Sequence, residues 1–304
     1  MNEIRDGFLV TEGRKRLWEV ELELIDFVDK VCVKNKLNYF LIGGAAIGAV
    51  RHGGFIPWDD DMDIGLLRAD FEKFVQIFKA MEHPNYIMEY GYKGDETTGT
   101  FLRIRDKRTT AIIRQQYHAN KEHGVFIELY PFDGVPSDEK KRNKQISSSA
   151  RLKAELDYRF DKRSLGKRGK LLHRYYSLFS TKKIWNKWQT VCTRYNGQKT
   201  GMVDTPALPG YAKQRIHLYH IEDVQESEYV DYDGHKVRVA KGNDRCLKIH
   251  FGDYMKLPPV EERGMKHSVI VFYDAFTPWQ EYMEKKKDVV DRFFDGEYKL
   301  SNIW

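Results

Sequence analysis

Cysteine is scarce in this chain of 304 residues, which contains three, at positions 32, 192 and 246. They are odd in number and form no CxxC spacing, so a disulfide framework and a cysteine-built zinc site are both disfavoured. Long hydrophobic runs are also missing: the longest, residues 39–50, contains three glycines and is followed by Arg51. A membrane-spanning helix needs about 20 apolar residues, so none is predicted. The first residues show no basic-then-apolar signal pattern. These absences predict a soluble, cytoplasmic protein.

Apolar residues are nevertheless sufficient for a large core. They make up 41% of the chain, and aromatic residues make up 13%. This composition excludes a disordered or fibrous protein. The length suits one large domain or two modest ones.

Positive charge is concentrated in the middle of the chain. The net charge is +6, but residues 140–187 contain 16 lysines and arginines against three acids, so this block carries +13 and the remainder −7. Leucine, tyrosine and tryptophan are interleaved with the basic residues. Such a block suits an anionic partner: a membrane surface, a phosphate-rich polymer or nucleic acid. A solvated helical hairpin with extended lysine side chains explains the pattern equally well.

Periodicity predicts alternating helices and strands over the first half of the chain. Apolar residues recur every three to four positions from Leu17 to Val31, which predicts a helix ending near Lys36. Asp70 is expected to cap a helix whose apolar face runs from Phe71 to Met81. Short strands are expected at 39–42, 100–106, 111–115 and 124–130. A short helix is expected at 45–50, after a glycine pair, and a loop entering a strand at 59–67.

The most informative segment is acidic and runs from Asp59 to Leu66. Side chains alternate between the two faces of a strand, so Asp61, Asp63 and Gly65 are expected on one face and the apolar residues between them on the other. Two carboxylates held side by side repel each other unless a cation lies between them. An all-oxygen pair favours Mg²⁺ or Mn²⁺ over zinc. Gly65 is expected to leave room for a ligand beside the pair.

A second strand, residues 125–130, offers a third carboxylate. Ile127 and Leu129 share one face, and Glu128 lies on the other. If this strand pairs beside the acidic one, Asp61, Asp63 and Glu128 form a three-carboxylate site for one or two divalent ions. Taken alone, Glu128 could equally be structural.

A pair of glycines, Gly43 and Gly44, stands between the strand expected at 39–42 and the short helix that follows. Glycines there let backbone N–H groups approach phosphate oxygens at a helix N-terminus. This order of helix, strand, glycine pair, acidic strand and later acidic strand resembles the polymerase-β-like nucleotidyltransferase fold. The predicted fold class is therefore α+β, a nucleotidyltransferase-like mixed sheet flanked by helices.

The segment from Gly43 to Ile64, which contains the sequence Arg-His-Gly-Gly-Phe-Ile-Pro-Trp-Asp-Asp-Asp, resembles the signature of the LicD family. Those bacterial proteins attach phosphocholine to sugars, and the fukutin-related phosphoribitol transferases are relatives. Shorter family-like blocks lie at 103–107, 127–136 and 251–259. Two departures stand out: Ala45-Ala46 replaces a common Thr-Leu, and Glu128 replaces the more usual Asp.

The resemblance implies transfer of a phospho-alcohol group, with phosphocholine favoured, from a CDP-linked donor. The acceptor would be a sugar hydroxyl of a cell-surface glycan, such as teichoic acid or lipopolysaccharide, or of its lipid-linked precursor, and CMP would leave. By motif, Asp61, Asp63 and Glu128 would be catalytic metal ligands for Mg²⁺ or Mn²⁺. Asp59 would support the loop or touch the acceptor.

Other candidates are assigned to substrate binding. Arg103 and Arg105 alternate with Ile104 and are expected to present both guanidinium groups to phosphate. Arg51 and His52 are expected to contact phosphate or brace the turn. Asp133 is an alternative to Glu128 as general base, and an aromatic cage for choline would involve Trp58 and Tyr130.

The pattern divides the chain into two regions. Residues 1–136 form the predicted nucleotidyltransferase-like catalytic core. Residues 137–304 form a basic, mostly helical C-terminal region that closes the site and contributes acceptor binding. Its block at 140–187 is expected to contact the inner face of the plasma membrane peripherally, and nucleic acid is not favoured as a partner.

Two other functions remain open on the sequence. A nucleotidyltransferase could deliver a nucleoside monophosphate to nucleic acid or a small molecule, with the basic block holding RNA. A non-catalytic binding module could retain the same fold. The loop at 51–58 favours phosphotransfer because it belongs to the LicD-like block.

Overall fold

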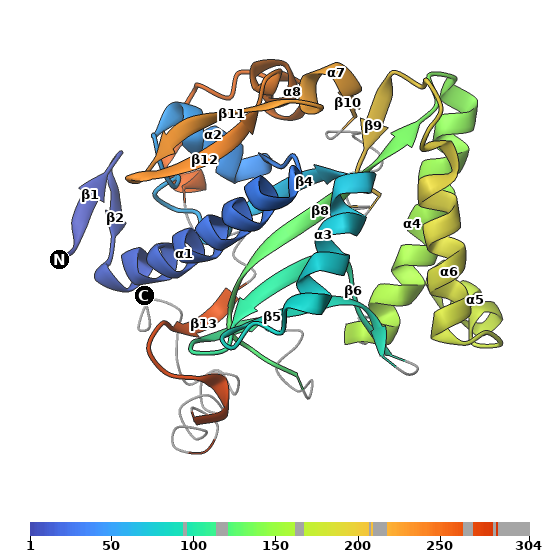
Figure 1. Ribbon diagram of the computed structural model, residues 1–304, viewed down its shortest axis with the longest axis horizontal. Coiled ribbons are helices and arrows are strands. Elements are labelled where there is room, and N and C mark those ends of the chain that lie inside the picture. Colours follow the sequence, from blue (N-terminus) through green and yellow to red (C-terminus); the bar gives the residue numbers. More distant parts are fainter. Residues whose placement is uncertain are drawn as a thin grey trace.

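A long helix and a mixed β-sheet carry the acidic segment in this computed structural model of the chain (Figure 1). The structure describes residues 1–93, 96–113, 121–161, 167–206, 208, 218–263, 270–281 and 284. The chain begins with a small hairpin of β1 (Glu3–Arg5) and β2 (Phe8–Val10), which leads into the first helix.

The predicted first helix is confirmed as α1 (Glu12–Asn35). The hydroxyl of Thr11 accepts a hydrogen bond from the backbone N–H of Arg14, which satisfies one free donor at the helix start. The helix ends at Lys36, which has a left-handed backbone. Its apolar stripe is buried against the sheet.

The predicted mixed sheet is also confirmed. The strand order is β10-β9-β8-β4-β3, and β6 pairs with β8 and with β5. Only β4 and β8 are parallel; the other described pairs are antiparallel. The strands are β3 (Phe40–Leu41), β4 (Asp63–Leu67), β5 (Tyr86–Lys93), β6 (Glu96–Asp106), β8 (Val125–Val135), β9 (Met202–Asp204) and β10 (Tyr219–His220).

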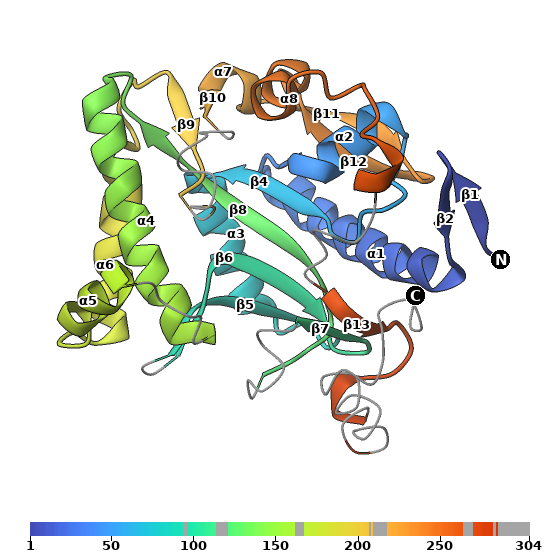
Figure 2. The same cartoon turned by 180° about the vertical axis from the view of Figure 1, so that it is seen from behind.

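Helices cover one face of this sheet. α1 and α3 (Arg68–Met81) lie on the same side of it, as the two opposite views show (Figures 1 and 2). Ile64, Leu66, Ile127 and Leu129 are buried in the core on that side. Because side chains alternate along a strand, Asp63, Glu128 and Arg103 belong to the opposite face. That opposite face also carries a second buried apolar cluster, which includes Phe40, Tyr130 and Phe132, so the carboxylates lie beside aromatic rings.

The second half begins with helices. α4 (Glu139–Asp161), α5 (Lys167–Tyr176) and α6 (Thr181–Cys192) lie together beside β6, around a core that includes Leu156 and Trp188. A short 3-10 helix follows at Thr193–Tyr195. This part agrees with the expected basic helical region.

From Met202 onward strands prevail, which differs from the expected mostly helical region. β9 and β10 extend the central sheet, and β13 (Ile270–Asp274) pairs with β7 (Thr110–Ile113). β11 (Ser227–Tyr232) and β12 (His235–Ala240) form a hairpin beside α1, joined through Asp233 and Gly234, both with positive φ. The remaining elements are α7 (Ile221–Val224), α8 (Asn243–Phe251) and a 3-10 helix at Val260–Glu262. The boundary at residue 136 stays a prediction.

Two local expectations need correction, and a third falls partly outside the described residues. Asp70 does not cap α3: it lies in the first turn, and its carboxylate accepts the backbone N–H of Asn38 at 3.1 Å. The acidic strand begins at Asp63, so Asp61 lies in the preceding loop. The strand expected at 111–115 is β7, and residues 114 and 115 lie outside the described residues.

The room expected beside Gly65 does not exist. A Cβ atom there would lie 2.6 Å from the ring of Phe40 and 2.7 Å from that of Phe132. Glycine at this position therefore accommodates two packed aromatic rings. In the described part of the chain, no helix is both long enough and apolar enough to cross a bilayer.

Candidate active site

The acidic loop is held in place by α1. Arg14 donates from Nη1 to the backbone carbonyl of Asp59 at 2.7 Å, and the indole N–H of Trp18 donates to the same carbonyl at 3.1 Å. Trp18 also stacks on Phe55, with ring centroids 4.9 Å apart. Two donors and one stacked ring thus fix the point at which the chain enters the acidic segment.

Three consecutive carboxylates converge in this loop. One side-chain oxygen from each of Asp59, Asp60 and Asp61 lies within 4.8 Å of the others. Asp60 is buried, whereas Asp59 and Asp61 are partly exposed. Asp59, which was expected to support the loop or touch the acceptor, thus lies in one carboxylate cluster with Asp60 and Asp61.

Asp63 and Glu128 meet across the parallel strand pair, as the alternation argument required. They are register partners on β4 and β8. The backbone N–H of Glu128 donates to the carbonyl of Met62 at 3.0 Å, and the N–H of Ile42 donates to that of Asp63 at 3.0 Å. Asp63 is therefore held between two neighbouring strands, with its side chain on the face opposite α1 and α3.

Glu128 is already engaged by two neighbours. Arg103 donates from Nε to its Oε1 at 2.7 Å, and the hydroxyl of Tyr130 donates to its Oε2. Both Glu128 and Arg103 are buried. Tyr130 also stacks on Phe101 at 4.7 Å. Among the three predicted ligands, Glu128 is thus the one held by both a guanidinium and a hydroxyl group.

Burial and mutual repulsion disfavour ionisation of these carboxylates. Burial raises the pKa of Asp61 well above its usual value, and the negative charges of Asp59 and Asp63 raise it further. Burial likewise raises the pKa of Asp63 well above its usual value, and the negative charge of Glu128 raises it further. Burial, followed by the charge of Asp60, raises the pKa of Asp59 to about 6. A bound cation would relieve this repulsion.

The residues present fit a hard divalent cation. Carboxylate oxygens are the donors that Mg²⁺ and Mn²⁺ prefer. Asp63 Oδ1 is buried and has no hydrogen-bond partner among the described residues. Asp59, Asp61 and Asp63 offer the most accessible oxygens, and Glu128 would have to share its carboxylate with Arg103.

The predicted glycine pair starts α2 (Gly43–Arg51) and touches the acidic segment. A Cβ atom on Gly44 would lie 2.2 Å from Asp59 Oδ2, and one on Gly43 would lie 3.7 Å from Asp63 Oδ2. Gly43 also has a φ of +60°, which disfavours other residues. Both glycines therefore let the helix N-terminus lie directly against two carboxylates.

The two arginines of β6 have different surroundings. Arg103 contacts Glu128 and lies 3.7 Å from Glu89. Arg105 donates from Nε to Glu89 at 2.6 Å and from Nη1 to the carbonyl of Gly124 at 2.9 Å. Arg105 is 1% exposed, so we interpret it as a structural residue of the protein interior. Arg103 is the arginine placed beside the acidic site.

Asp133 lies on the other face of β8 from Glu128. It is 1% exposed and receives two hydrogen bonds from Arg68, at 2.8 and 2.5 Å, and one from Asn196 at 2.7 Å. Three hydrogen bonds thus hold the Asp133 carboxylate on the face of β8 away from the acidic cluster, whereas Glu128 lies beside that cluster. The choice between Glu128 and Asp133 as general base stays a prediction.

The loop residues before the acidic segment contact other parts of the protein. Arg51 donates to the carbonyl of Tyr254 at 2.6 Å, and His52 Nε2 lies 3.1 Å from a carboxylate oxygen of Asp6. The guanidinium carbon of Arg263 lies over the ring of Trp58, 5.4 Å from the ring centroid. These contacts brace the loop; roles in substrate binding stay predictions.

Sequence reasoning missed Glu21. This residue of α1 is 0% exposed, and neither of its carboxylate oxygens has a hydrogen-bond partner among the described residues. Burial raises its pKa well above the usual value, followed by the charges of Asp60 and Asp59. The sequence feature that could have identified Glu21 is its position as a charged residue within the apolar stripe that contains Leu17 and Leu24.

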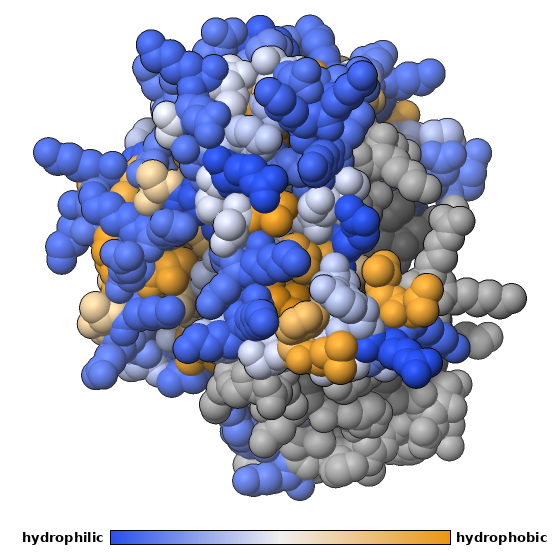
Figure 3. All heavy atoms as spheres, turned by 90° about the vertical axis from the view of Figure 1, so that its right-hand side faces the viewer, coloured by the Kyte–Doolittle hydropathy of each residue, from blue (hydrophilic) through white to orange (hydrophobic). Residues whose placement is uncertain are grey.

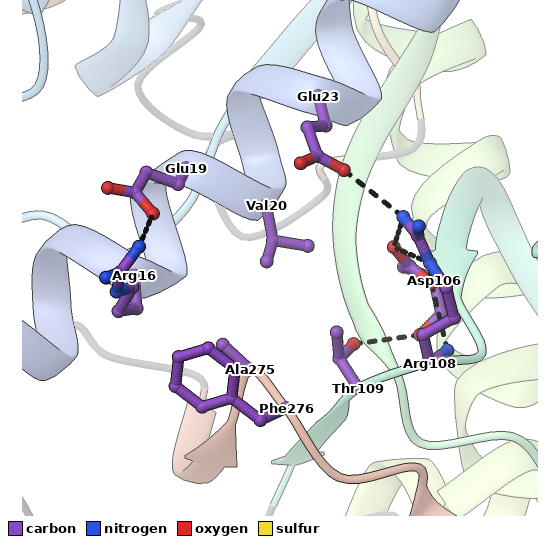
Figure 4. Close-up of a pocket in the computed structure, with 9 residues that line it drawn as sticks. All are labelled: Arg16, Glu19, Val20, Glu23, Asp106, Arg108, Thr109, Ala275 and Phe276. Atoms are coloured by element: carbon purple, nitrogen blue, oxygen red, sulfur yellow. Dashed lines mark hydrogen bonds and ion pairs between the residues drawn. The ribbon is translucent and has the colours of Figure 1, made fainter.

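A separate pocket of about 360 Å³ lies between α1, the end of β6 and the segment after β13 (Figure 4). Its charged side chains pair with one another: Arg16 with Glu19 at 2.6 Å, and Arg108 with Glu23 at 3.2 Å. It contains none of the residues predicted for the site, so the acidic cluster remains the candidate active site.

Comparison with known proteins identifies relatives of this chain. Residues 36–166 match the family described as LicD/FKTN/FKRP, nucleotidyltransferase domain. The chain is 27% identical over 250 residues to the lipopolysaccharide cholinephosphotransferase LicD of Haemophilus influenzae, an alignment that covers 81% of this chain and 92% of that protein. It is 37% identical over 131 residues to an uncharacterized protein of Rickettsia prowazekii, covering 38% of this chain and 49% of that one.

A third relative is human. The ribitol 5-phosphate transferase FKRP of Homo sapiens is 31% identical over 100 residues, which cover 33% of this chain and 18% of FKRP. The predicted resemblance is thereby confirmed: residues 36–166 match a LicD family domain, and the similarity to two phosphotransferases supports an enzyme of the LicD type.

Proposed function

We propose that this enzyme transfers a phospho-alcohol group, with phosphocholine favoured, from a CDP-linked donor to a sugar hydroxyl. The acceptor would belong to a cell-surface glycan or its lipid-linked precursor. The observation that carries the proposal is the position of Asp59 and Asp63 against the Gly43–Gly44 start of α2, within a LicD-family domain. The similarity to a lipopolysaccharide cholinephosphotransferase supports the choice of group and acceptor.

The residues that would hold Mg²⁺ are Asp59, Asp61 and Asp63, with Glu128 beside them. The cation would neutralise the negative charge of the diphosphate and of the transition state. The N-terminus of α2 would bind phosphate oxygens through its backbone N–H groups. Arg103 would add a fixed positive charge next to Glu128.

In the proposed reaction, the acceptor hydroxyl oxygen forms a bond to the phosphorus that bears the alcohol. The bond between this phosphorus and the oxygen bridging to CMP breaks, and CMP leaves with that electron pair. Glu128 takes the proton of the hydroxyl. Since Arg103 and Tyr130 hold both oxygens of Glu128, the carboxylate is oriented before the acceptor arrives.

Product identity tests the proposal. Purified protein with Mg²⁺ is incubated with CDP-choline, CDP-ribitol and CDP-glycerol together with glycan acceptors, and release of CMP is measured. We expect CMP and a phosphodiester-linked glycan. Release of pyrophosphate from a nucleoside triphosphate would favour the alternative nucleotidyltransferase activity. Absence of both products with every donor would contradict the proposal.

We also propose that the block at 140–187 contacts the inner face of the plasma membrane, where a lipid-linked acceptor would lie. Residues 162–203 contain 11 lysines and arginines and no acidic residue. On α5 and the turn after it, Leu171 is 72% exposed, Tyr175 53% and Leu178 76%. Lys170, Arg174 and Lys182 are exposed nearby. Apolar groups among hydrophilic ones are visible on this side of the molecule (Figure 3).

Vesicle flotation tests this contact without catalysis. We expect the protein to float with vesicles of mixed anionic and zwitterionic lipid, and to be released by high salt. The double variant Leu171→Ser/Leu178→Ser should lose flotation. A matched control, Ile4→Ser, removes a side chain that is 74% exposed on the N-terminal hairpin and should float normally. Equal flotation of both variants would remove the proposed membrane contact and leave the proposed reaction intact.

A further inference from the structure

A row of four charged side chains crosses the sheet from β5 to the acidic segment. Glu89 on β5 is the register partner of Arg103 on β6. Arg103 is in turn the partner of Glu128 on β8, and Glu128 is the partner of Asp63 on β4. The four strands lie side by side (Figure 2). Directly opposed residues of neighbouring strands point to the same face of a sheet, so this row places the charges minus, plus, minus and minus on one face.

The contacts along the row follow the register. Arg103 donates from Nε to Glu128 Oε1 at 2.7 Å, and its Nη1 atom lies 3.7 Å from Glu89 Oε1. Glu89 and Arg103 are both buried. The guanidinium carbon lies over the rings of Phe101 and Phe126, 4.7 and 5.1 Å from their centroids. One arginine is thus shared between an acid of the candidate site and an acid outside it.

Glu89 is an ionised group that is anchored independently of Arg103. Arg105 donates from Nε to Glu89 Oε2 at 2.6 Å, and Lys121 donates from Nζ to Glu89 Oε1 at 2.6 Å. Burial raises the pKa of Glu89, but the positive charges of three neighbouring side chains, Arg105 first, outweigh burial and lower the pKa to about 2. A fixed negative charge therefore faces the Nη1 side of Arg103.

The guanidinium of Arg103 has donors that could compete with a cation. An arginine binds a carboxylate most strongly through two parallel N–H groups. Here the hydrogen bond to Glu128 comes from Nε, while Nη1 faces Glu89. Without the charge of Glu89, Nη1 would be free to turn toward the carboxylates of the site, where it would compete with a divalent ion.

We propose that Glu89 is a positioning residue of the candidate cation site: by holding the Nη1 side of Arg103, it keeps the carboxylate of Glu128 available to the cation. This inference rests on the cation site of the proposed function. Glu89 acts through Arg103 and contacts neither the cation nor the substrate. Residues outside the direct ligands commonly contribute about 10- to 100-fold to metal affinity.

Mn²⁺ binding to the full chain, measured by isothermal titration calorimetry, tests the role of Glu89. Glu89→Gln keeps the size and removes the charge, and we expect about 10-fold weaker Mn²⁺ binding. Glu23→Gln is the matched control: Glu23 also pairs with an arginine, Arg108, at 3.2 Å, but its side chain is 59% exposed and lies outside the row. Its loss should leave Mn²⁺ binding unchanged.

A cycle of double variants separates positioning through Arg103 from a general loss of structure. In Arg103→Met the guanidinium that Glu89 holds is absent, so the further change Glu89→Gln should alter Mn²⁺ affinity less than about twofold. The affinities are compared on proteins whose circular dichroism matches that of the wild type. Equal losses of affinity in both backgrounds would show that Glu89 acts independently of Arg103 and would overturn the inference.

A charge-balanced variant guards against misfolding. Glu89→Gln leaves Arg105 and Lys121 without their anion, which is costly in a protein interior. Glu89→Gln/Lys121→Gln removes one charge of each sign, and it should bind Mn²⁺ more weakly than Lys121→Gln, which keeps Glu89. Equal affinity of these two proteins would overturn the proposal. If neither variant of Glu89 folds, the residue is structural and the inference is likewise overturned.

The outcomes also separate this inference from the proposed function. If Asp61→Asn loses Mn²⁺ binding and Glu89→Gln binds as the wild type does, the cation site stands and the role of Glu89 is overturned. If the wild type binds no Mn²⁺, the cation requirement of the proposed function fails and the role of Glu89 falls with it.

Discussion

Asp63 and Glu128 are register partners across β4 and β8, the parallel pair of the central sheet. On the other side of β8, Arg103 is the register partner of Glu128 and donates to it at 2.7 Å. The order across the sheet is thus carboxylate, carboxylate, guanidinium. The arginine offsets one of two like charges and leaves Asp63 to face the acidic loop.

Replacing either central aspartate should abolish transfer. Asp61→Asn and Asp63→Asn remove a charged oxygen with little change of shape, and we expect turnover to fall at least about 100-fold. Both variants should unfold at or above the wild-type temperature without metal, because a repelling charge is lost. CMP release and circular dichroism measure the two effects.

The control for these variants is Asp231→Asn on β11, where the side chain is 80% exposed. It should keep full activity. A near-normal rate in Asp61→Asn or Asp63→Asn would remove the assigned site.

Removal of Arg103 should be costly to the fold. Arg103→Met leaves Glu128 buried without its cation, and we expect a loss of about 3–5 kcal/mol in the free energy of unfolding. The double variant Arg103→Met/Glu128→Gln should recover part of it. Urea denaturation measures both. Equal stability of Arg103→Met and the wild type would mean that Glu128 is not a charged partner in the folded protein.

Asp133 should prove structural. Asp133→Ala leaves the guanidinium of Arg68 buried and unpaired, and we expect a loss of about 3–5 kcal/mol with little change in turnover per folded molecule. Denaturant titration measures the loss of stability, and kcat calculated per folded molecule measures the effect on turnover. A folded Asp133→Asn protein with kcat lowered as far as in Asp61→Asn would instead make Asp133 the general base.

Gly44→Ala should weaken cation binding, because the added methyl group would displace the carboxylate of Asp59. The Cβ of Gly44→Ala would lie 2.2 Å from Asp59 Oδ2, so Asp59 must move away from the helix N-terminus. We expect Mn²⁺ affinity and turnover to fall about 10-fold or more, while the helical content is retained. Unchanged Mn²⁺ affinity would show that the Asp59 carboxylate is not part of the cation site.

Cation binding should strengthen as pH rises. The pKa of Asp59 is raised from its ordinary value of 3.8 to about 6, so protonation of Asp59 stabilises the metal-free fold below about pH 4. This contribution is lost as pH rises through about 6. A cation must displace that proton, so Mn²⁺ affinity should increase up to and beyond pH 6.

The variant Asp59→Asn supplies the comparison for this pH dependence. It removes the titrating group, so its Mn²⁺ affinity should be lower and change less between pH 5 and pH 7, a range chosen to bracket the raised pKa of about 6. Calorimetry at several pH values measures both proteins. Parallel pH profiles would exclude Asp59 as the titrating ligand.

Local sequence patterns determined which residues share a face and where several elements begin. The alternation in 61–66 correctly placed Asp63 opposite Ile64 and Leu66, and the stripe from Leu17 correctly predicted α1. The Gly43–Gly44 pair correctly marked the start of α2. These features depend on backbone geometry within a few residues, which the sequence specifies directly.

Only the tertiary structure decided which faces meet. Gly65 has no room for a ligand because the rings of Phe40 and Phe132, from neighbouring strands, lie against it. Asp133 is paired with Arg68, which lies on α3. Arg14 and Trp18 hold the carbonyl of Asp59 because α1 packs against the loop that precedes β4. Each of these contacts joins residues far apart in the chain, and it follows from burial of the whole core rather than from any local pattern.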